Sequence, residues 1–231
     1  MQIDHSGRCL QVIAELRRIL ASPHTDGGTF IGRFLYLNSV LQNQNSGTKG
    51  AGLTGGVQQE NLWFEMLDAG NETSSTGTAR FTRACPPNTE PTRDYDYYFG
   101  DYPLSHKTIG WSGSGMLALA WSKNPEGGLE RSEFESSMLI VCSRKPAARG
   151  MWSSIATGVY LVPLPVLQTT VTLTSNNKSD SIISTSDAIR CMAVAAEQRL
   201  FIPFTYDHEK GRHRFVSLWH SGPEAIRTRN P

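Results

Sequence analysis

The segment that most restricts the fold of this chain is residues 138–142, five consecutive apolar side chains with the sequence Met-Leu-Ile-Val-Cys. A helix buried on all sides needs a longer run, and a strand with one wet face alternates apolar and polar residues. A short apolar run is typical of a strand that is buried on both faces of a sheet. We therefore predict a two-sided buried strand over residues 134–143.

Further strand-like segments lie on both sides of this one. Residues 108–122 are rich in Trp, Leu and Ala, and the turn signal at 124–128 predicts that they pair antiparallel with residues 134–143. Two segments flank the turn-forming residues 207–211 and predict a hairpin, 200–206 and 214–219. Shorter strands are predicted at 79–83, 158–162 and 167–174.

Helical periodicity is clearest over residues 8–21, where apolar side chains fall on one face: Cys9, Leu10, Val12, Ile13, Leu16, Ile19 and Leu20. A second helix is predicted from the capping residue Ser186 to about residue 198. Residues 29–42 fit a helix or strands, and we favour the helix. Residues 43–56 hold five glycines and predict a long loop, followed by a short apolar element at 62–67.

These elements predict an α+β fold dominated by β-structure. We expect an antiparallel sheet or sandwich with an N-terminal helix and a helix near residues 186–198. The length of 231 residues fits one large domain or two small ones, and no repeat or clear linker divides the chain. We expect a single β-rich domain over 1–231, with an N-terminal helical segment at about 6–42 and a β-rich body at about 60–220.

The charge balance excludes several classes of protein. Lys and Arg number 22 against 21 Asp and Glu, so the net charge of +1 cannot drive strong non-specific binding to nucleic acid. No apolar run approaches the roughly 20 residues of a membrane span, and the N-terminus lacks the pattern of a secretory signal. We expect intracellular synthesis and four reduced, mostly buried cysteines without a metal-binding Cys-x-x-Cys.

Motifs for catalysis are weak. The segment Gly-Trp-Ser-Gly-Ser at 110–114 lacks the last glycine of a nucleophile elbow, and we interpret His106 just upstream as a surface residue at a strand start. His208, His213 and His220 do not have the spacing of a zinc site. We therefore predict no catalytic residues, no metal and no cofactor.

The most distinctive local feature is a cluster of aromatic residues among acids, comprising Tyr95, Tyr97, Tyr98, Phe99 and Tyr102. Such rings suit a protein interface or a glycan site, or they form a loop that packs its own tyrosines on the sheet. A small basic patch is formed by Lys210, Arg212, His213 and Arg214. It is either a contact site or a set of solvated hairpin charges.

Low charge, long polar loops and the lack of a catalytic motif favour a non-enzymatic assembly protein. Its partners would be copies of itself or other subunits, as in a virion capsid or tail, with nucleic acid unfavoured as the main partner. One alternative is a hydrolase without a standard linear motif, drawing on Ser112, His106, His208 or Cys142. A second is a glycan- or membrane-binding β module that exposes Tyr95, Tyr97, Tyr98 and Trp111.

Overall fold

A computed structural model shows how these segments are arranged. The structure describes residues 4–23, 30–34, 37, 51–72, 80–84, 96–109, 117–119, 134–142, 156–171, 173–175, 181–209, 212–219 and 225–226.

Two sheets and several helices make up the described part of the chain. The larger sheet contains eight strands in the order β1-β2-β3-β5-β6-β9-β10-β11, and the smaller one has the order β4-β8-β7. In chain order the helices are α1 (His5–Ala21), α3 (Ala51–Glu72), α4 (Leu164–Thr170) and α5 (Thr185–Glu197). The strands are β1 (Phe81–Arg83), β2 (Tyr97–Phe99), β3 (Tyr102–Ile109), β4 (Leu117–Leu119), β5 (Ser137–Cys142), β6 (Gly158–Val162), β7 (Leu173–Ser175), β8 (Ser181–Ile183), β9 (Phe201–Glu209), β10 (Arg212–Trp219) and β11 (Ala225–Ile226).

The α+β class is confirmed, but the expectation of an antiparallel sheet is wrong. The larger sheet is mixed, because β3 and β5 run parallel in the register Leu104↔Ser137 to Ile109↔Cys142. Of the strand predicted at 108–122, residues 108 and 109 pair parallel with β5 and residues 117–119 pair with β8, so these described residues do not pair antiparallel with β5. The chain between β3 and β5 contains β4, which pairs with β8 in the other sheet. Parallel neighbours need such a crossover in place of a hairpin.

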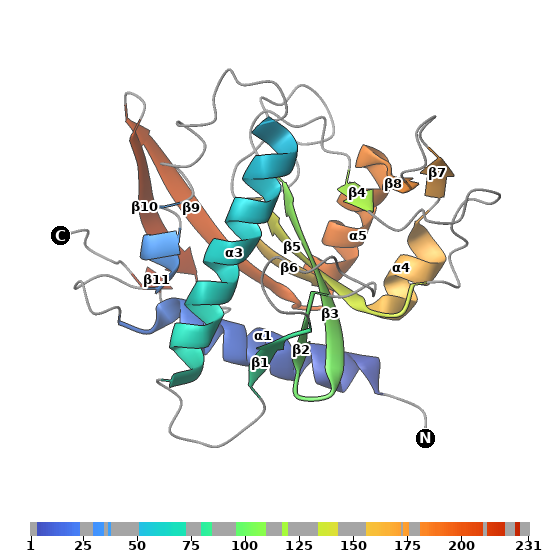
Figure 1. The fold of residues 1–231 in the computed structure, drawn as a ribbon, viewed down its shortest axis with the longest axis horizontal. Coiled ribbons are helices and arrows are strands. Elements are labelled where there is room, and N and C mark those ends of the chain that lie inside the picture. The colour runs from blue at the N-terminus through green and yellow to red at the C-terminus, as the bar shows by residue number, and fades with distance from the viewer. Residues whose placement is uncertain are drawn as a thin grey trace.

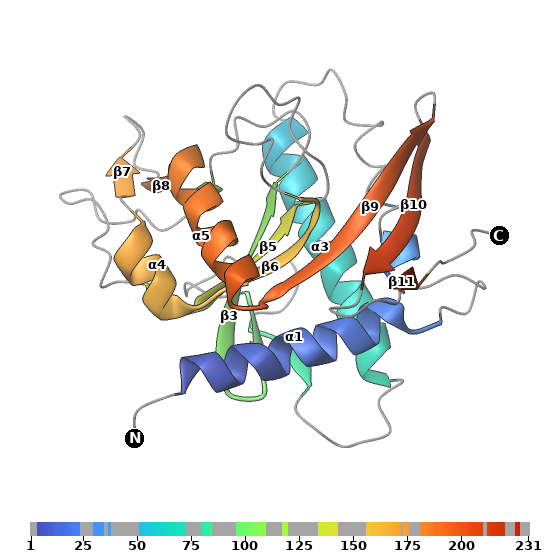
Figure 2. The ribbon, with the colours of Figure 1, turned by 180° about the vertical axis from the view of Figure 1, so that it is seen from behind.

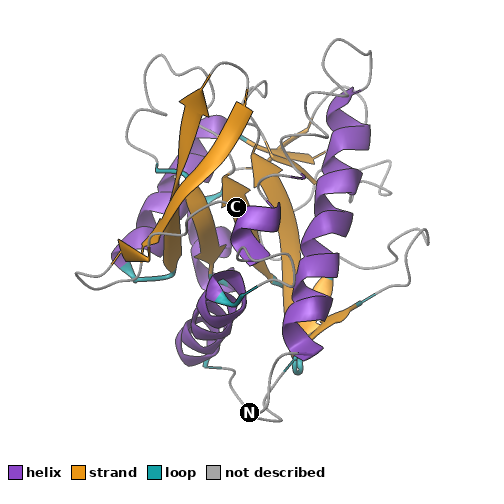
Figure 3. Cartoon of the chain, turned by 90° about the vertical axis from the view of Figure 1, so that its left-hand side faces the viewer, coloured by secondary structure: helices purple, strands orange, loops and turns teal. Residues whose placement is uncertain are grey.

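Helices lie on both sides of the central strands. In Figure 1, α3 stands on one side of β5 and β6 while α4 and α5 stand on the other, and Figure 2 shows the same order from behind. Helix α1 lies across one end of the strands, as Figures 2 and 3 show. This is the end where β3, β5 and β9 begin: Cys9 of α1 approaches Tyr102 and Ser137, and Arg17 donates to the carbonyl of Phe201.

The buried strand at the centre is confirmed. All six residues of β5 are buried, and so are all five of β6, which pairs with it antiparallel. The side chains of Leu139 and Leu161, which face each other across this pair, are fully inaccessible to solvent. Strands covered on both faces carry apolar side chains at every position, and this explains the run at 138–142.

Helix α1 forms as predicted, with one exception on its apolar face. The six other apolar side chains of that face are buried, but Leu10 is 51% exposed. The helix begins earlier than predicted because the Asp4 carboxylate accepts a hydrogen bond from the amide of Gly7 at 3.1 Å. Three of the four cysteines, Cys9, Cys142 and Cys191, are free and buried as expected, and Cys85 lies outside the described residues.

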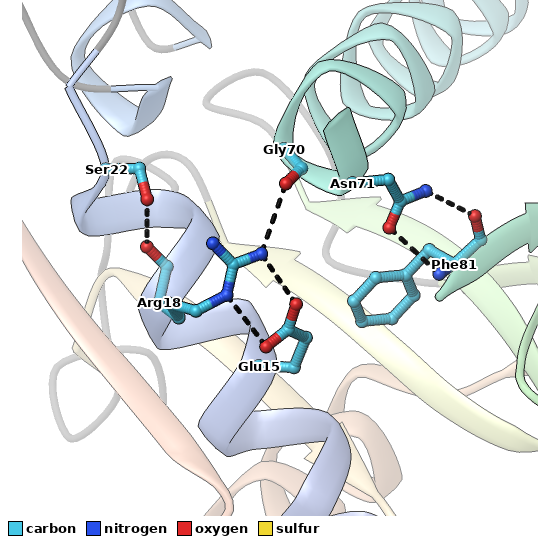
Figure 4. Close-up of polar contacts among 6 residues, drawn as sticks. All are labelled: Glu15, Arg18, Ser22, Gly70, Asn71 and Phe81. Carbon is cyan, nitrogen blue, oxygen red and sulfur yellow. Dashed lines mark hydrogen bonds and ion pairs between the residues drawn. The ribbon is translucent and has the colours of Figure 1, made fainter. Parts of the chain in front are cut away.

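The end of α3 packs closely against α1. Arg18 donates to both carboxylate oxygens of Glu15, at 2.6 and 2.9 Å, and to the carbonyl of Gly70 at 3.1 Å (Figure 4). A methyl group at Gly70 would lie 2.9 Å from Cγ1 of Ile19 and closer still to Cγ2. The glycine therefore permits an approach of the two helices that a larger residue would block.

The glycine-rich segment gives a further correction. Residues 51–56, predicted as loop, form the first turns of α3, and residues 62–67 belong to the same helix. A glycine costs a helix about 1 kcal/mol relative to alanine. Once a helix exists, each further residue that joins it adds one backbone hydrogen bond. The packed later turns of α3 can therefore support the glycine-rich turns at its start. Trp63 and Leu67, both fully buried, anchor those later turns.

Two boundaries in the C-terminal half also differ from the prediction. Residues 167–170, the first part of the strand predicted at 167–174, belong to α4, which has Pro165 in its first turn, a position that suits proline. Helix α5 is confirmed, but its cap is Ser184, whose hydroxyl accepts from the amide of Asp187. The hairpin of β9 and β10 is confirmed, with longer strands than predicted. No helix in the described part of the chain is both long and apolar enough to cross a membrane.

Candidate functional site

Three charged side chains lie within electrostatic range of Glu60, where α3 passes over the strands β1 to β3. Glu60 belongs to α3, Asp96 directly precedes β2, Arg83 ends β1, and Lys107 lies in β3. The pKa of Glu60 responds to all three of the other groups, which shows that they share one electrostatic environment. Nothing in the local sequence brings these residues together, because they come from four separate elements.

Glu60 has a strongly perturbed carboxyl group. Its pKa is raised to about 7, first by burial and then by the negative charge of Asp96, while the positive charges of Lys107 and Arg83 act in the opposite direction. A carboxyl group with a pKa near neutrality can both take up and release a proton.

Asp96 is held firmly between two strands. Its backbone amide donates to the carbonyl of Leu104 at 2.9 Å, and its carbonyl accepts from the amide of Ala84 at 3.0 Å. One of its carboxylate oxygens, Oδ2, accepts a hydrogen bond from the backbone amide of His106.

Arg83 is held against α3 by two contacts. Its guanidinium lies over the ring of Phe64, 4.3 Å from the ring centroid, and Nη1 donates to Oδ1 of Asn61 at 3.4 Å. Both contacts come from α3, so they hold the cation beside the helix that carries Glu60.

Three buried aromatic side chains lie beneath the charged residues. The ring of His106 lies 5.5 Å from that of Trp63 and 6.3 Å from that of Tyr97, centroid to centroid. Burial lowers the pKa of His106 to about 3 and raises that of Tyr97 well above its usual value, so both side chains are neutral. Each ring carries one buried polar atom without a hydrogen-bond partner: Trp63 Nε1, Tyr97 OH and His106 Nδ1.

The aromatic cluster singled out in the sequence lies largely in the core. Tyr97 and Phe99 belong to β2 and Tyr102 opens β3, and all three are buried, so they cannot form an exposed glycan or membrane surface. They form strands, where a loop was one interpretation. Tyr98 is half-buried and Tyr95 lies outside the described residues, so a partner contact through these two stays a prediction.

The other sequence candidates are not brought together by the described residues. His106, expected at the surface, is buried in the middle of β3 because α3 covers this face with Trp63. Cys142 is buried at the end of β5, the backbone of His208 lies in β9, and Ser112 and Trp111 lie outside the described residues. In the basic patch, the backbones of Arg212, His213 and Arg214 lie in β10, and Lys210 is outside the described residues.

A second polar cluster lies under the first turns of α1. The hydroxyl of Tyr102 is 2.6 Å from Ser137 Oγ, 3.0 Å from His5 Nδ1 and 3.5 Å from Cys9 Sγ. Ser137 Oγ also accepts from the amide of Leu164 at 2.9 Å. Burial raises the pKa of Cys9, which keeps it as a thiol. Every member has a partner, so this cluster joins α1 to the sheet.

The sequence prediction missed Glu60, Asp96 as a site residue, Arg83 and Lys107. Among the described residues no group of three or more His, Cys, Asp or Glu side chains is arranged to hold a metal, so any cation here would rest on two carboxylates. The chain matches no family model, no curated protein and no solved structure in the comparisons made. The function must therefore be argued from this site itself.

Proposed function

We propose that the protein is a hydrolase of phosphate esters that binds a divalent cation between Glu60 and Asp96. The observation that carries the proposal is that the partly buried carboxyl group of Glu60 feels the charges of a second carboxylate, Asp96, and of two cations, Arg83 and Lys107. Mg²⁺ is commonly bound through one or two carboxylates and completes its shell with water and substrate phosphate. The two basic side chains supply charge that suits the phosphate.

The reaction expected of such a site is the transfer of a phosphoryl group to water. A water oxygen bonds to phosphorus, the bond between phosphorus and the ester oxygen breaks, and the departing oxygen takes a proton from solvent. Glu60 and Asp96 would hold the divalent cation, which would lower the pKa of the attacking water, and the proton of that water would pass to solvent. Lys107 or Arg83 stabilises the negative charge that develops on the phosphate oxygens.

The preferred reading of the sequence, a structural subunit that binds copies of itself, is a separate proposal. It is supported by the near-neutral net charge of +1, which gives copies of the chain little mutual repulsion. Light scattering of the purified protein tests it: assemblies are expected, and a monomer at high concentration would contradict it. Intracellular localisation likewise stays a prediction.

The hydrolase proposal is tested by cation binding and by turnover. Titration calorimetry with Mn²⁺ should show binding that Glu60→Gln and Asp96→Asn abolish. Hydrolysis of bis(p-nitrophenyl) phosphate and of linear DNA should need Mg²⁺ or Mn²⁺, and Lys107→Met should slow it on the order of 100-fold.

Glu65→Gln is the matched control, because Glu65 lies on the same helix and is exposed. This variant should bind Mn²⁺ and hydrolyse the substrates like the unmodified protein. If the unmodified protein neither binds Mn²⁺ nor cleaves any of these esters, the proposed function is wrong.

A further inference from the structure

The three unpartnered polar atoms beneath the charged site need an explanation of their own. Trp63 and Tyr97 are fully buried and His106 is 4% exposed, yet Nε1, OH and Nδ1 of these residues lack hydrogen-bond partners. A buried polar group without a partner destabilises a fold by about 1–3 kcal/mol. Native structures leave few such groups, and three from adjacent side chains are not expected to be left together.

These rings are neighbours but do not satisfy one another directly. The His106 ring is inclined by 40° to that of Trp63 and by 50° to that of Tyr97, so neither pair is stacked. The indole of Trp63 lowers the pKa of the Tyr97 hydroxyl as a hydrogen-bond donor does, but the contact falls outside the geometry of a formed hydrogen bond. The other ring nitrogen of His106, Nε2, is already 3.1 Å from Thr108 Oγ1.

The hydrogen-bonding capacity of these three unpartnered atoms matches that of a single water molecule. The indole of Trp63 can only donate, the hydroxyl of Tyr97 can donate and accept, and Nδ1 of a neutral histidine does one or the other according to its tautomer. A water molecule offers two donors and two acceptors, and buried waters typically make about three hydrogen bonds.

We propose that one buried water molecule bridges Trp63 Nε1, Tyr97 OH and His106 Nδ1 between α3 and the strands β2 and β3. The water satisfies all three groups at once and joins the helix that carries Glu60 to the strand that carries Lys107. The water has a structural role, and this proposal does not depend on whether the chain hydrolyses phosphate esters.

The sign of a stability change distinguishes a hydrated site from a dry one. If the site is hydrated, Tyr97→Phe removes one hydrogen bond of the water and should raise the equilibrium constant for unfolding on the order of tenfold. If the site is dry, the same change removes an unpartnered hydroxyl and should lower that constant, which would overturn the proposal. Chemical denaturation monitored by Trp fluorescence measures it.

A second measurement detects the water in the unmodified protein and uses variants only for assignment and control. NMR of the unmodified protein should show a cross-peak between a long-lived water and the Trp63 indole proton, identified among the five Trp signals by Trp63→Phe. Tyr160→Phe is the matched control, because its buried hydroxyl donates directly to the carbonyl of Ala156 at 2.7 Å. It should leave the cross-peak unchanged, and the absence of any such cross-peak in the unmodified protein would refute the water site.

Discussion

His106 makes the stability of the protein depend on pH, with a sign that the structure determines. Its pKa is about 3 in the folded chain and 6.5 when unperturbed, because burial disfavours the charged imidazolium. Between these values the unfolded chain binds a proton that the folded chain does not, so stability is lost as pH falls from about 6.5 toward 3. Between pH 7 and pH 5 the loss amounts to about 2 kcal/mol.

Glu60 opposes this effect in the same pH range. Its folded pKa of about 7 lies above the unperturbed 4.5, so its protonation stabilises the fold as pH falls through 7. The two effects on stability partly cancel in the unmodified protein. The pH dependence of its stability would therefore not reveal the contribution of His106. The measurement is therefore made in the Glu60→Gln variant, where the opposing effect of Glu60 is absent.

Denaturant unfolding of Glu60→Gln at pH 7 and pH 5 should show the loss of about 2 kcal/mol. The double variant Glu60→Gln/His106→Asn should lose much less over the same interval, and carboxyl groups elsewhere contribute equally to both proteins. Equal losses in the two variants would show that His106 is not buried in its neutral form and would refute the reasoning.

Two further predictions concern the packing of α3. Gly70→Ala should destabilise the protein by about 1–3 kcal/mol in thermal unfolding, despite the higher helix propensity of alanine, because the methyl group overlaps Ile19. Adding Ile19→Ala should cost less in this variant than alone, and additive costs would exclude the clash. The amide of Asn71 bonds both the carbonyl and the N–H of Phe81, at 2.6 and 3.2 Å (Figure 4). Asn71→Ala should therefore cost about 1–3 kcal/mol in denaturant unfolding, and a cost near zero would show that water replaces the amide.

Local sequence patterns predicted the elements whose burial is continuous. Residues 138–142 form the predicted buried strand, and residues 8–21 form the predicted helix. A strand or helix whose surroundings stay the same along its length has a regular pattern of apolar residues, and that pattern can be recognised in the sequence. Leu10 differs because the edge of an apolar face can stay exposed. The parallel pairing of β3 with β5 depends on the route of the chain through β4, which no local pattern records.

The candidate site was missed for a related reason. Glycines at 52, 55 and 56 were interpreted as a loop, and this concealed the helical spacing of buried residues at Gln59, Trp63, Met66 and Gly70. With α3 recognised, Glu60 would have stood one position from a buried face. Its neighbours Asp96 and Lys107 still come from other strands, and only the tertiary fold brings their charges together.

Helix α3 links the stability of the fold to the geometry of the site. At one end Gly70 fits against Ile19 of α1, and ten residues earlier Glu60 faces the strands, a separation of about 15 Å along a helix. Between them Trp63 packs against His106, whose own amide holds Asp96. A change in the position of α3 on α1 would therefore displace Glu60 relative to Asp96, so the small residue at 70 matters to the site although it lies far from it.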